Sequence, residues 1–160
     1  GTVEENLKMA KPDATKEEME AVLQKVNLLG FLQTQDGLQT QLLEKASNLS
    51  GGQCQRLVIA RALLRTDSAV YIFDEAASNI DVESEELIMN VIHELAKTKT
   101  VLLIYHRLAN VVKSDKIYFL KDGEIKESGK HDELMSQNGA YRHLYESQMA
   151  LENYGKGGMA

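Results

Sequence analysis

The fold is decided by residues 49–76, which read LSGGQCQRLVIARALLRTDSAVYIFDEA. A serine and two glycines stand directly before a long apolar run punctuated by arginines, which predicts a helix over residues 53–65 with Ser50 as its N-cap. Residues 69–73 form a short run of apolar, β-branched and aromatic side chains, which predicts a buried strand. A capped helix followed by such a strand is typical of an α/β protein.

The alternation of helix and strand continues toward the C-terminus. Residues 82–98 predict an amphipathic helix, and residues 100–105 predict a second buried strand. Residues 115–129 resemble a hairpin with Asp122-Gly123 at its turn. Apolar strands that alternate with helices predict a mostly parallel sheet covered by helices on both faces.

The two ends of the chain are predicted to be helical. In the polar N-terminal part, Thr15 and Glu18 form a capping box before apolar positions at helical spacing, and Gly30 is expected to end that helix. Near the C-terminus, Asn138-Gly139 is expected to separate two short helices. We therefore divide the chain into a helical subdomain portion (1–48), the helix that follows LSGG with an α/β core (49–135), and a C-terminal helix with a flexible tail (136–160).

Composition narrows the classes of function. The 160 residues suit one domain with a real core, and 18 basic against 24 acidic residues give a net charge of −6, which argues against a nucleic-acid partner. Cys54 is the single cysteine, so no internal disulfide forms. No apolar run approaches the roughly 20 residues that span a bilayer. We expect any membrane association to come through a partner or another part of the chain.

Polar residues follow both predicted strands of the core. Asp74 and Glu75 come after the first strand and His106 after the second, and ligands of parallel sheets bind at the carboxyl ends of strands. One carboxylate near a phosphate suits Mg²⁺ held through water, and the next can orient an attacking water. A histidine there can hydrogen-bond a phosphate. Taken alone, each feature has a plainer interpretation: a solvated turn and a partly buried structural histidine.

The start of the helix predicted over residues 53–65 is a candidate anion site. Glycines let backbone N–H groups approach a ligand, and a helix N-terminus favours negative charge. With Ser50, this stretch offers phosphate binding by backbone and hydroxyl groups. The plainer interpretation is an ordinary capped helix after a flexible loop.

The combination and order of these features resemble the ATP-binding cassette (ABC) ATPase domain. LSGGQ (49–53) is similar to the family's signature motif, VYIFDE (70–75) to its Walker B strand and catalytic glutamate, and SNID (78–81) to its D-loop, where SALD is commoner. His106 is similar to the switch histidine. Residues 131–148, HDELMSQNGAYRHLYESQ, resemble the C-terminal run of exporter-type members, in which one chain joins a transmembrane domain to the ATPase domain.

The resemblance implies a role for each motif residue. Asp74 would hold Mg²⁺ through water, Glu75 would polarise the attacking water and His106 would contact the γ-phosphate. Asp81 would lie across the interface of a head-to-tail dimer. The signature residues would contact the γ-phosphate of the nucleotide held by the opposite domain; they are Ser50, Gly51, Gly52 and Gln53. The implied ligands are ATP and Mg²⁺. The implied partners are a second ATPase domain and a transmembrane domain, at the cytoplasmic face of the cell membrane.

Two parts of the family's pattern are missing from these 160 residues. There is no P-loop, G-x-x-x-x-G-K-[ST], and no Q-loop glutamine. We therefore expect a portion of an ABC ATPase domain that is inactive alone and binds ATP weakly. The strand at 69–73 is expected to present an unpaired edge, which favours self-association.

Two other functions stay open at this point. The chain is alternatively a natural half-domain that completes a partner's site without catalysis. Another possibility is part of an ABC-type ATPase of chromosome maintenance or DNA repair. In those proteins, long heptad coiled coils separate the two halves of the ATPase domain. The acidic net charge and the lack of a heptad array before residue 49 argue against the latter.

Overall fold

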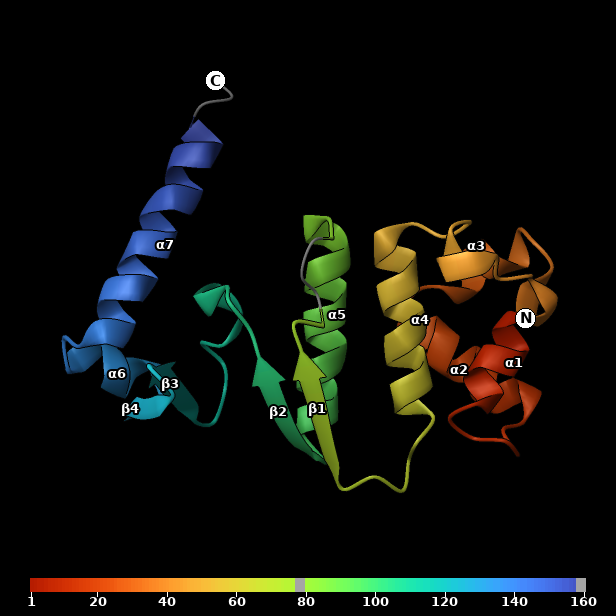
Figure 1. Cartoon of the computed structure of the whole chain (residues 1–160), viewed down its shortest axis with the longest axis horizontal. Coiled ribbons are helices and arrows are strands. Elements are labelled where there is room, and N and C mark those ends of the chain that lie inside the picture. The colour runs from red at the N-terminus through yellow and green to blue at the C-terminus, as the bar shows by residue number, and fades with distance from the viewer. Residues whose placement is uncertain (77–79, 158–160) are drawn as a thin grey trace. The chain divides into compact units, whose positions relative to one another are not determined.

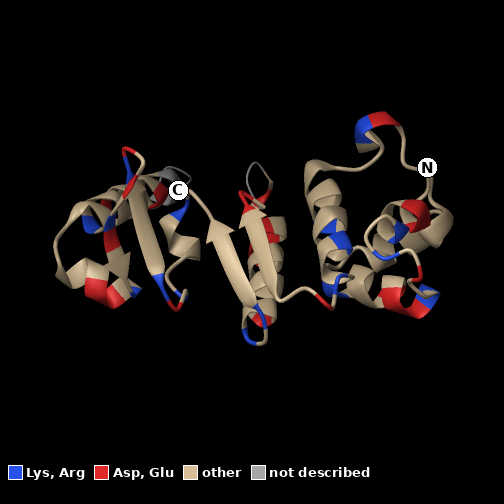
Figure 2. Cartoon of the chain, turned by 60° about the horizontal axis from the view of Figure 1, so that its bottom comes forward, with Lys and Arg blue, Asp and Glu red and all other residues tan. Residues whose placement is uncertain are grey.

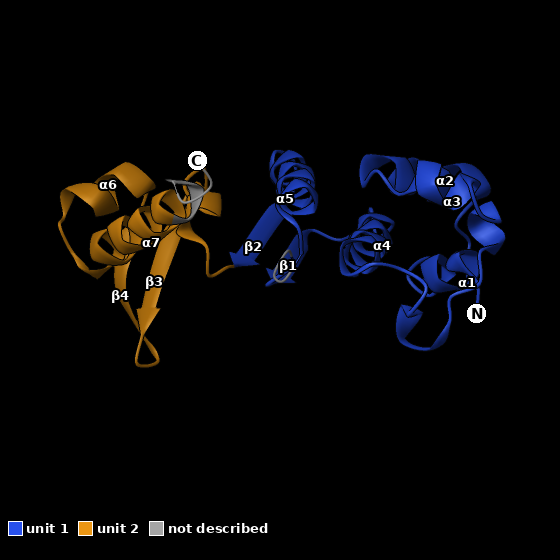
Figure 3. Ribbon diagram, turned by 90° about the horizontal axis from the view of Figure 1, so that it is seen from above, with its two compact units in different colours: residues 1–104 blue, residues 105–160 orange. Residues whose placement is uncertain are grey.

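The computed structural model describes residues 1–76 and 80–157, and it divides the chain into two compact units, residues 1–104 and 105–160 (Figure 1, Figure 3). Residues 78 and 79 of the expected D-loop lie outside the described residues. The three segments expected from the sequence follow functional motifs rather than compactness, and they stay a prediction.

The first unit begins with short helices. These are α1 (Val3–Lys8), α2 (Lys16–Lys25), α3 (Leu29–Gln33) and the 3₁₀ turns η1 (Gly37–Gln39) and η2 (Glu44–Ala46). The predicted capping box is confirmed, since Thr15 Oγ1 accepts from the Glu18 N–H at 3.2 Å. The predicted end at Gly30 is wrong. Helix α2 ends earlier because Asn27 takes a left-handed conformation (φ 52°), which Asn tolerates well, and Gly30 lies inside α3.

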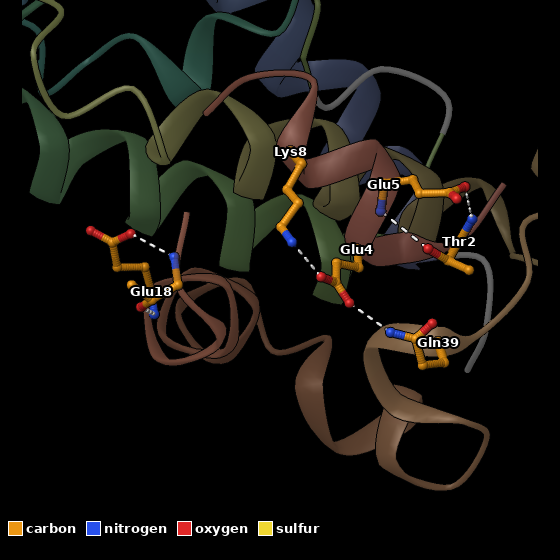
Figure 4. A network of polar contacts seen from close by, with 7 residues as sticks. Thr2, Glu4, Glu5, Lys8, Glu18 and Gln39 are labelled. Atoms are coloured by element: carbon orange, nitrogen blue, oxygen red, sulfur yellow. Dashed lines mark hydrogen bonds and ion pairs between the residues drawn. The ribbon is translucent and has the colours of Figure 1, made fainter. Parts of the chain in front are cut away.

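Polar contacts tie α1 to the segment around η1 (Figure 4). Thr2 caps α1 reciprocally with Glu5, and the Glu4 carboxylate accepts from both Lys8 and Gln39, the latter at 2.6 Å. Ion pairing with Lys8 lowers the pKa of Glu4. On the inner side of α1, Val3 and Leu7 are fully buried. Both side chains therefore belong to the core of the first unit, in which α1 and α2 also contact α4.

The rest of the first unit contains the predicted α/β alternation. Its elements are α4 (Gly51–Leu63), β1 (Val70–Asp74), α5 (Val82–Ala96) and β2 (Thr100–Ile104). Strands β1 and β2 pair in parallel, with a register that runs from Val70 opposite Thr100 to Asp74 opposite Ile104 (Figure 1). The parallel pairing is thus confirmed for these two strands, and their carboxyl ends lie at the same edge.

The two faces of the β1–β2 sheet differ. Tyr71 and Phe73 are buried, on strand positions that alternate with exposed ones, and α5 contacts β2. The opposite face is bare among the described residues, where four apolar side chains are 45–65% exposed: Val70, Ile72, Leu102 and Ile104. The predicted helical cover on both faces is therefore present on one face only within residues 1–76 and 80–157.

The second unit is a hairpin with two helices. It contains η3 (Leu108–Asn110), the antiparallel strands β3 (Ile117–Lys121) and β4 (Glu124–Gly129), α6 (His131–Ser136) and α7 (Ala140–Gly157). The hairpin turn is as predicted, with φ 54° at Asp122 and 76° at Gly123. Asn138, at φ 53°, separates the helices as expected. Of the helices described, none is at once long and apolar enough to cross a membrane.

Candidate functional site

The turn at the start of α4 is capped by its own side chains. Ser50 Oγ accepts from the Gln53 N–H at 3.2 Å, and the Ser50 N–H donates to Gln53 Oε1 at 2.8 Å. The predicted Ser50 cap is confirmed, but the reciprocal role of Gln53 was missed, although S-x-x-Q is a capping-box pattern. A hydroxyl that accepts a bond can still donate its proton, so Ser50 remains able to bind an anion.

The two glycines of this turn serve different geometries. A Cβ on Gly52 would lie 2.8 Å from Ser84 Oγ and 3.3 Å from Asp81 Oδ2, so only glycine allows α4 to approach α5 this closely. A Cβ on Gly51 would meet no atom within 4 Å, and this residue is exposed. Gly52 therefore serves packing between helices, whereas Gly51 leaves the start of α4 open.

Asp81 caps the neighbouring helix. Its Oδ1 accepts from the Ser84 N–H at 2.8 Å at the start of α5. Hydrogen bonds from the Ser84 backbone and hydroxyl lower the pKa of the Asp81 carboxyl, with a smaller contribution from the positive charge of Arg56. The turn of residues 50–53, called the signature turn below, and Asp81 are thus close together, since both contact the start of α5. The expected role of Asp81 across a dimer interface stays a prediction.

The two carboxylates lie where the strand pattern predicts them. Asp74 is the last residue of β1 and is exposed, and acidic residues stand at the tip of that strand (Figure 2). Glu75 follows in a left-handed conformation (φ 50°), and its N–H donates to the Ile104 carbonyl of β2 at 3.0 Å. Such a conformation costs a non-glycine residue about 1 kcal/mol, so the bond to β2 helps to hold it. The chain therefore leaves the strand abruptly at Glu75.

His106 belongs to the second unit, two residues beyond the end of β2. The amide of Gln148 on α7 bonds to the backbone on both sides of Arg107: it donates to the His106 carbonyl at 2.7 Å and accepts from the Leu108 N–H at 2.9 Å. The first unit thus brings together the signature turn and Asp81 and also holds Asp74 and Glu75. No single-sequence signal links residues 106 and 148, so Gln148 was missed.

Comparisons with known proteins identify the family. The family described as ABC transporter matches residues 1–78. An uncharacterized ABC transporter ATP-binding protein of Haemophilus influenzae is 51% identical over 152 residues, which are 95% of this chain and 27% of that protein. An ATP-dependent lipid A-core flippase of Mannheimia succiniciproducens is 44% identical over 149 residues, 92% of this chain and 25% of that protein.

A further relative and a solved structure agree with these matches. A putative multidrug export ATP-binding/permease protein of Staphylococcus aureus is 41% identical over 148 residues, 92% of this chain and 25% of that protein. The structure of a bacterial Atm1-family ABC exporter with ATP bound is similar at a TM-score of 0.84 and 30% identity, over 92% of this chain and 26% of that one. The chain spans about a quarter of the length of these relatives. The resemblance seen in the motifs is confirmed: the chain matches the ATP-binding domain of ABC transporters, and exporters are among its relatives.

Proposed function

We propose that this chain is a portion of the ATP-hydrolysing domain of an ABC exporter and couples ATP hydrolysis to transport across a membrane. The observation that carries the proposal is the pair of carboxylates at the carboxyl end of β1, in a chain whose α4 begins with a capped, open signature turn. The names of the relatives support the same reading, since they include a flippase and a multidrug export protein.

Glu75 is the residue we assign to the attacking water. A carboxylate that accepts a proton from a water molecule makes that water a better nucleophile toward phosphorus. The left-handed backbone turns the chain out of the strand at this residue, and the bond to Ile104 holds that turn in place. A carboxamide at this position would keep the size of the side chain but would lose the base.

Asp74 is the residue we assign to Mg²⁺. Its exposed carboxylate offers the oxygen ligands that Mg²⁺ prefers, and one or two carboxylates with waters and substrate phosphates are a usual magnesium site. Mg²⁺ bound there with ATP would offset the negative charge of the phosphates. No group of three or more His, Cys, Asp or Glu side chains suited to a metal occurs within residues 1–76 and 80–157.

The signature turn is assigned to the nucleotide of a second domain. The open N-terminus of α4 has Ser50 with a free proton to donate, Gly51 with no neighbour over its Cα, and the positive end of the helix dipole. Asp81 would then stand near the same dimer interface, and His106 would contact the γ-phosphate. A transmembrane domain would place this assembly at the cytoplasmic face of the cell membrane.

We also propose that the 160 residues by themselves bind ATP weakly and self-associate. They contain no P-loop, and the bare face of the β1–β2 sheet exposes apolar side chains that favour association. Calorimetry with ATP and light scattering over a range of concentrations test this. Micromolar ATP affinity, or a clean monomer at high concentration, would contradict it.

An assay of the complete transporter tests the main proposal. The purified protein, reconstituted in lipid, is expected to hydrolyse ATP only with Mg²⁺ present, and EDTA should stop the reaction. Double-stranded DNA should leave the rate unchanged. Stimulation by DNA would favour an ATPase of chromosome maintenance instead, and a lack of Mg-ATP hydrolysis would favour a non-catalytic partner module.

A further inference from the structure

The carboxamide of Gln148 bridges the backbone around His106. Its nitrogen donates to the His106 carbonyl at 2.7 Å, and its oxygen accepts from the Leu108 N–H at 2.9 Å. These residues are about 40 positions apart in sequence, so the contact depends on how α7 packs against the segment before η3. A primary amide is well suited to this contact because it offers a donor and an acceptor side by side.

Helix α7 is anchored on the face that carries Gln148. Tyr141, at the start of α7, is fully buried and its hydroxyl lies 2.8 Å from His131 Nδ1. Tyr145, Gln148 and Glu152 follow at helical spacing on the same face, and Glu152 Oε1 pairs with Arg107 Nη2 at 3.1 Å. The pair between Arg107 and Glu152 is partly exposed and adds little by itself. The buried start of the helix therefore fixes where Gln148 meets the loop.

The bridge restrains the backbone of residues 106–108, and this backbone determines where the His106 side chain points. Arg107, between the two bonded residues, is extended (φ −89°, ψ 105°), and η3 begins directly after it. With both neighbours of Arg107 held by one amide, the backbone from His106 to Leu108 has little freedom to rotate. The position of the His106 ring then depends on a backbone segment that α7 holds in place.

We propose that Gln148 is a positioning residue for His106: its amide holds the 106–108 backbone so that the histidine presents its ring to the γ-phosphate. The inference rests on the proposed role of His106 in ATP hydrolysis. Gln148 itself touches no nucleotide in this account. Its effect on the reaction passes through the backbone of His106.

The test uses the complete transporter with Gln148→Met, which keeps the length of the side chain and removes both hydrogen bonds. Asn153→Ala is the matched control, because Asn153 is an exposed amide on the same helix. Hydrogen exchange of peptides covering residues 104–112 reports the bridge directly. We expect faster exchange there and about tenfold lower kcat with little change in KM for ATP, since small misplacements of a catalytic group have effects of this size. Asn153→Ala should change neither.

A double mutant separates this proposal from the assignment of His106. If Gln148 acts through His106, Gln148→Met should have no further effect on kcat in a His106→Ala background. Unchanged exchange in Gln148→Met would overturn the bridge, and an equal loss of kcat in both backgrounds would overturn its action through His106. If His106→Ala alone keeps full turnover while exchange in Gln148→Met still rises, the role of His106 fails, and with it the positioning role, although the bridge itself stands.

Discussion

The start of α4 and the end of β1 are both assigned to phosphate chemistry, but they are built in opposite ways. The start of α4 is stabilised by its own capping box and packs against α5 through Gly52. The end of β1 is held by its pairing with β2, which the bond from the Glu75 N–H to the Ile104 carbonyl extends, and the sheet beside it exposes an apolar face. The first region is therefore set by local chemistry, whereas the second depends on what surrounds the sheet.

The largest effect on stability is expected when a side chain on the buried face of β1 is removed, whereas a change on its exposed face should have little effect. Phe73→Ala removes a ring that is 6% exposed and should lower the free energy of unfolding by about 3–5 kcal/mol. Ile72→Thr, next to it on the bare face at 65% exposure, should change it by no more than about 0.5 kcal/mol. Urea unfolding of the 160-residue chain, at a concentration low enough to keep it monomeric, measures both. Equal losses would mean that the bare face is covered in solution.

The glycine pair tests how tightly the start of α4 is packed. Gly52→Ala should destabilise by about 1–3 kcal/mol, because the new methyl group would lie 2.8 Å from Ser84 Oγ and 3.2 Å from its Cβ. Gly51→Ala meets nothing and should be neutral or stabilise by up to about 1 kcal/mol through helix propensity. Thermal unfolding of the two variants provides the comparison. A harmless Gly52→Ala would show that α4 and α5 do not approach closely.

Removing the cap should destabilise less than Phe73→Ala or Gly52→Ala. Ser50→Ala loses the bond to the Gln53 N–H and should cost about 1 kcal/mol, as measured by urea unfolding. Ser50→Asp keeps a capping oxygen and should restore that stability. The same aspartate places a negative charge where a phosphate is proposed to bind, so it should still lower ATPase activity in the complete transporter. A Ser50→Asp variant with full activity would argue against the phosphate role of this turn.

Sequence predicted the parts of the fold that depend on neighbours in the chain. The caps at Thr15 and Ser50 follow from short-range patterns, as does the turn at Asp122-Gly123, and their residue types fix the local backbone. The two parallel strands followed from their apolar runs, which place Asp74 at a carboxyl end.

The rest depends on contacts that one sequence does not encode locally. Asn27 ends α2 by a left-handed turn that competes with an equally good glycine signal at Gly30. The bare sheet face could not be predicted, because apolar runs predict burial whether or not a covering layer is present. Gln148 reaches its partners across about 40 residues, and its helical pattern alone does not point to them.

The most direct test of the central claim is the steady-state ATPase rate of the complete transporter with Glu75→Gln. Glu83→Gln, an exposed carboxylate in the first turn of α5, serves as the matched control. We predict that Glu75→Gln lowers kcat at least about 100-fold, which corresponds to a rise of roughly 3 kcal/mol in activation free energy, while a fluorescent ATP analogue still binds. Glu83→Gln should keep normal turnover. Wild-type turnover in Glu75→Gln would contradict the assignment of the catalytic base and the proposed site at the end of β1.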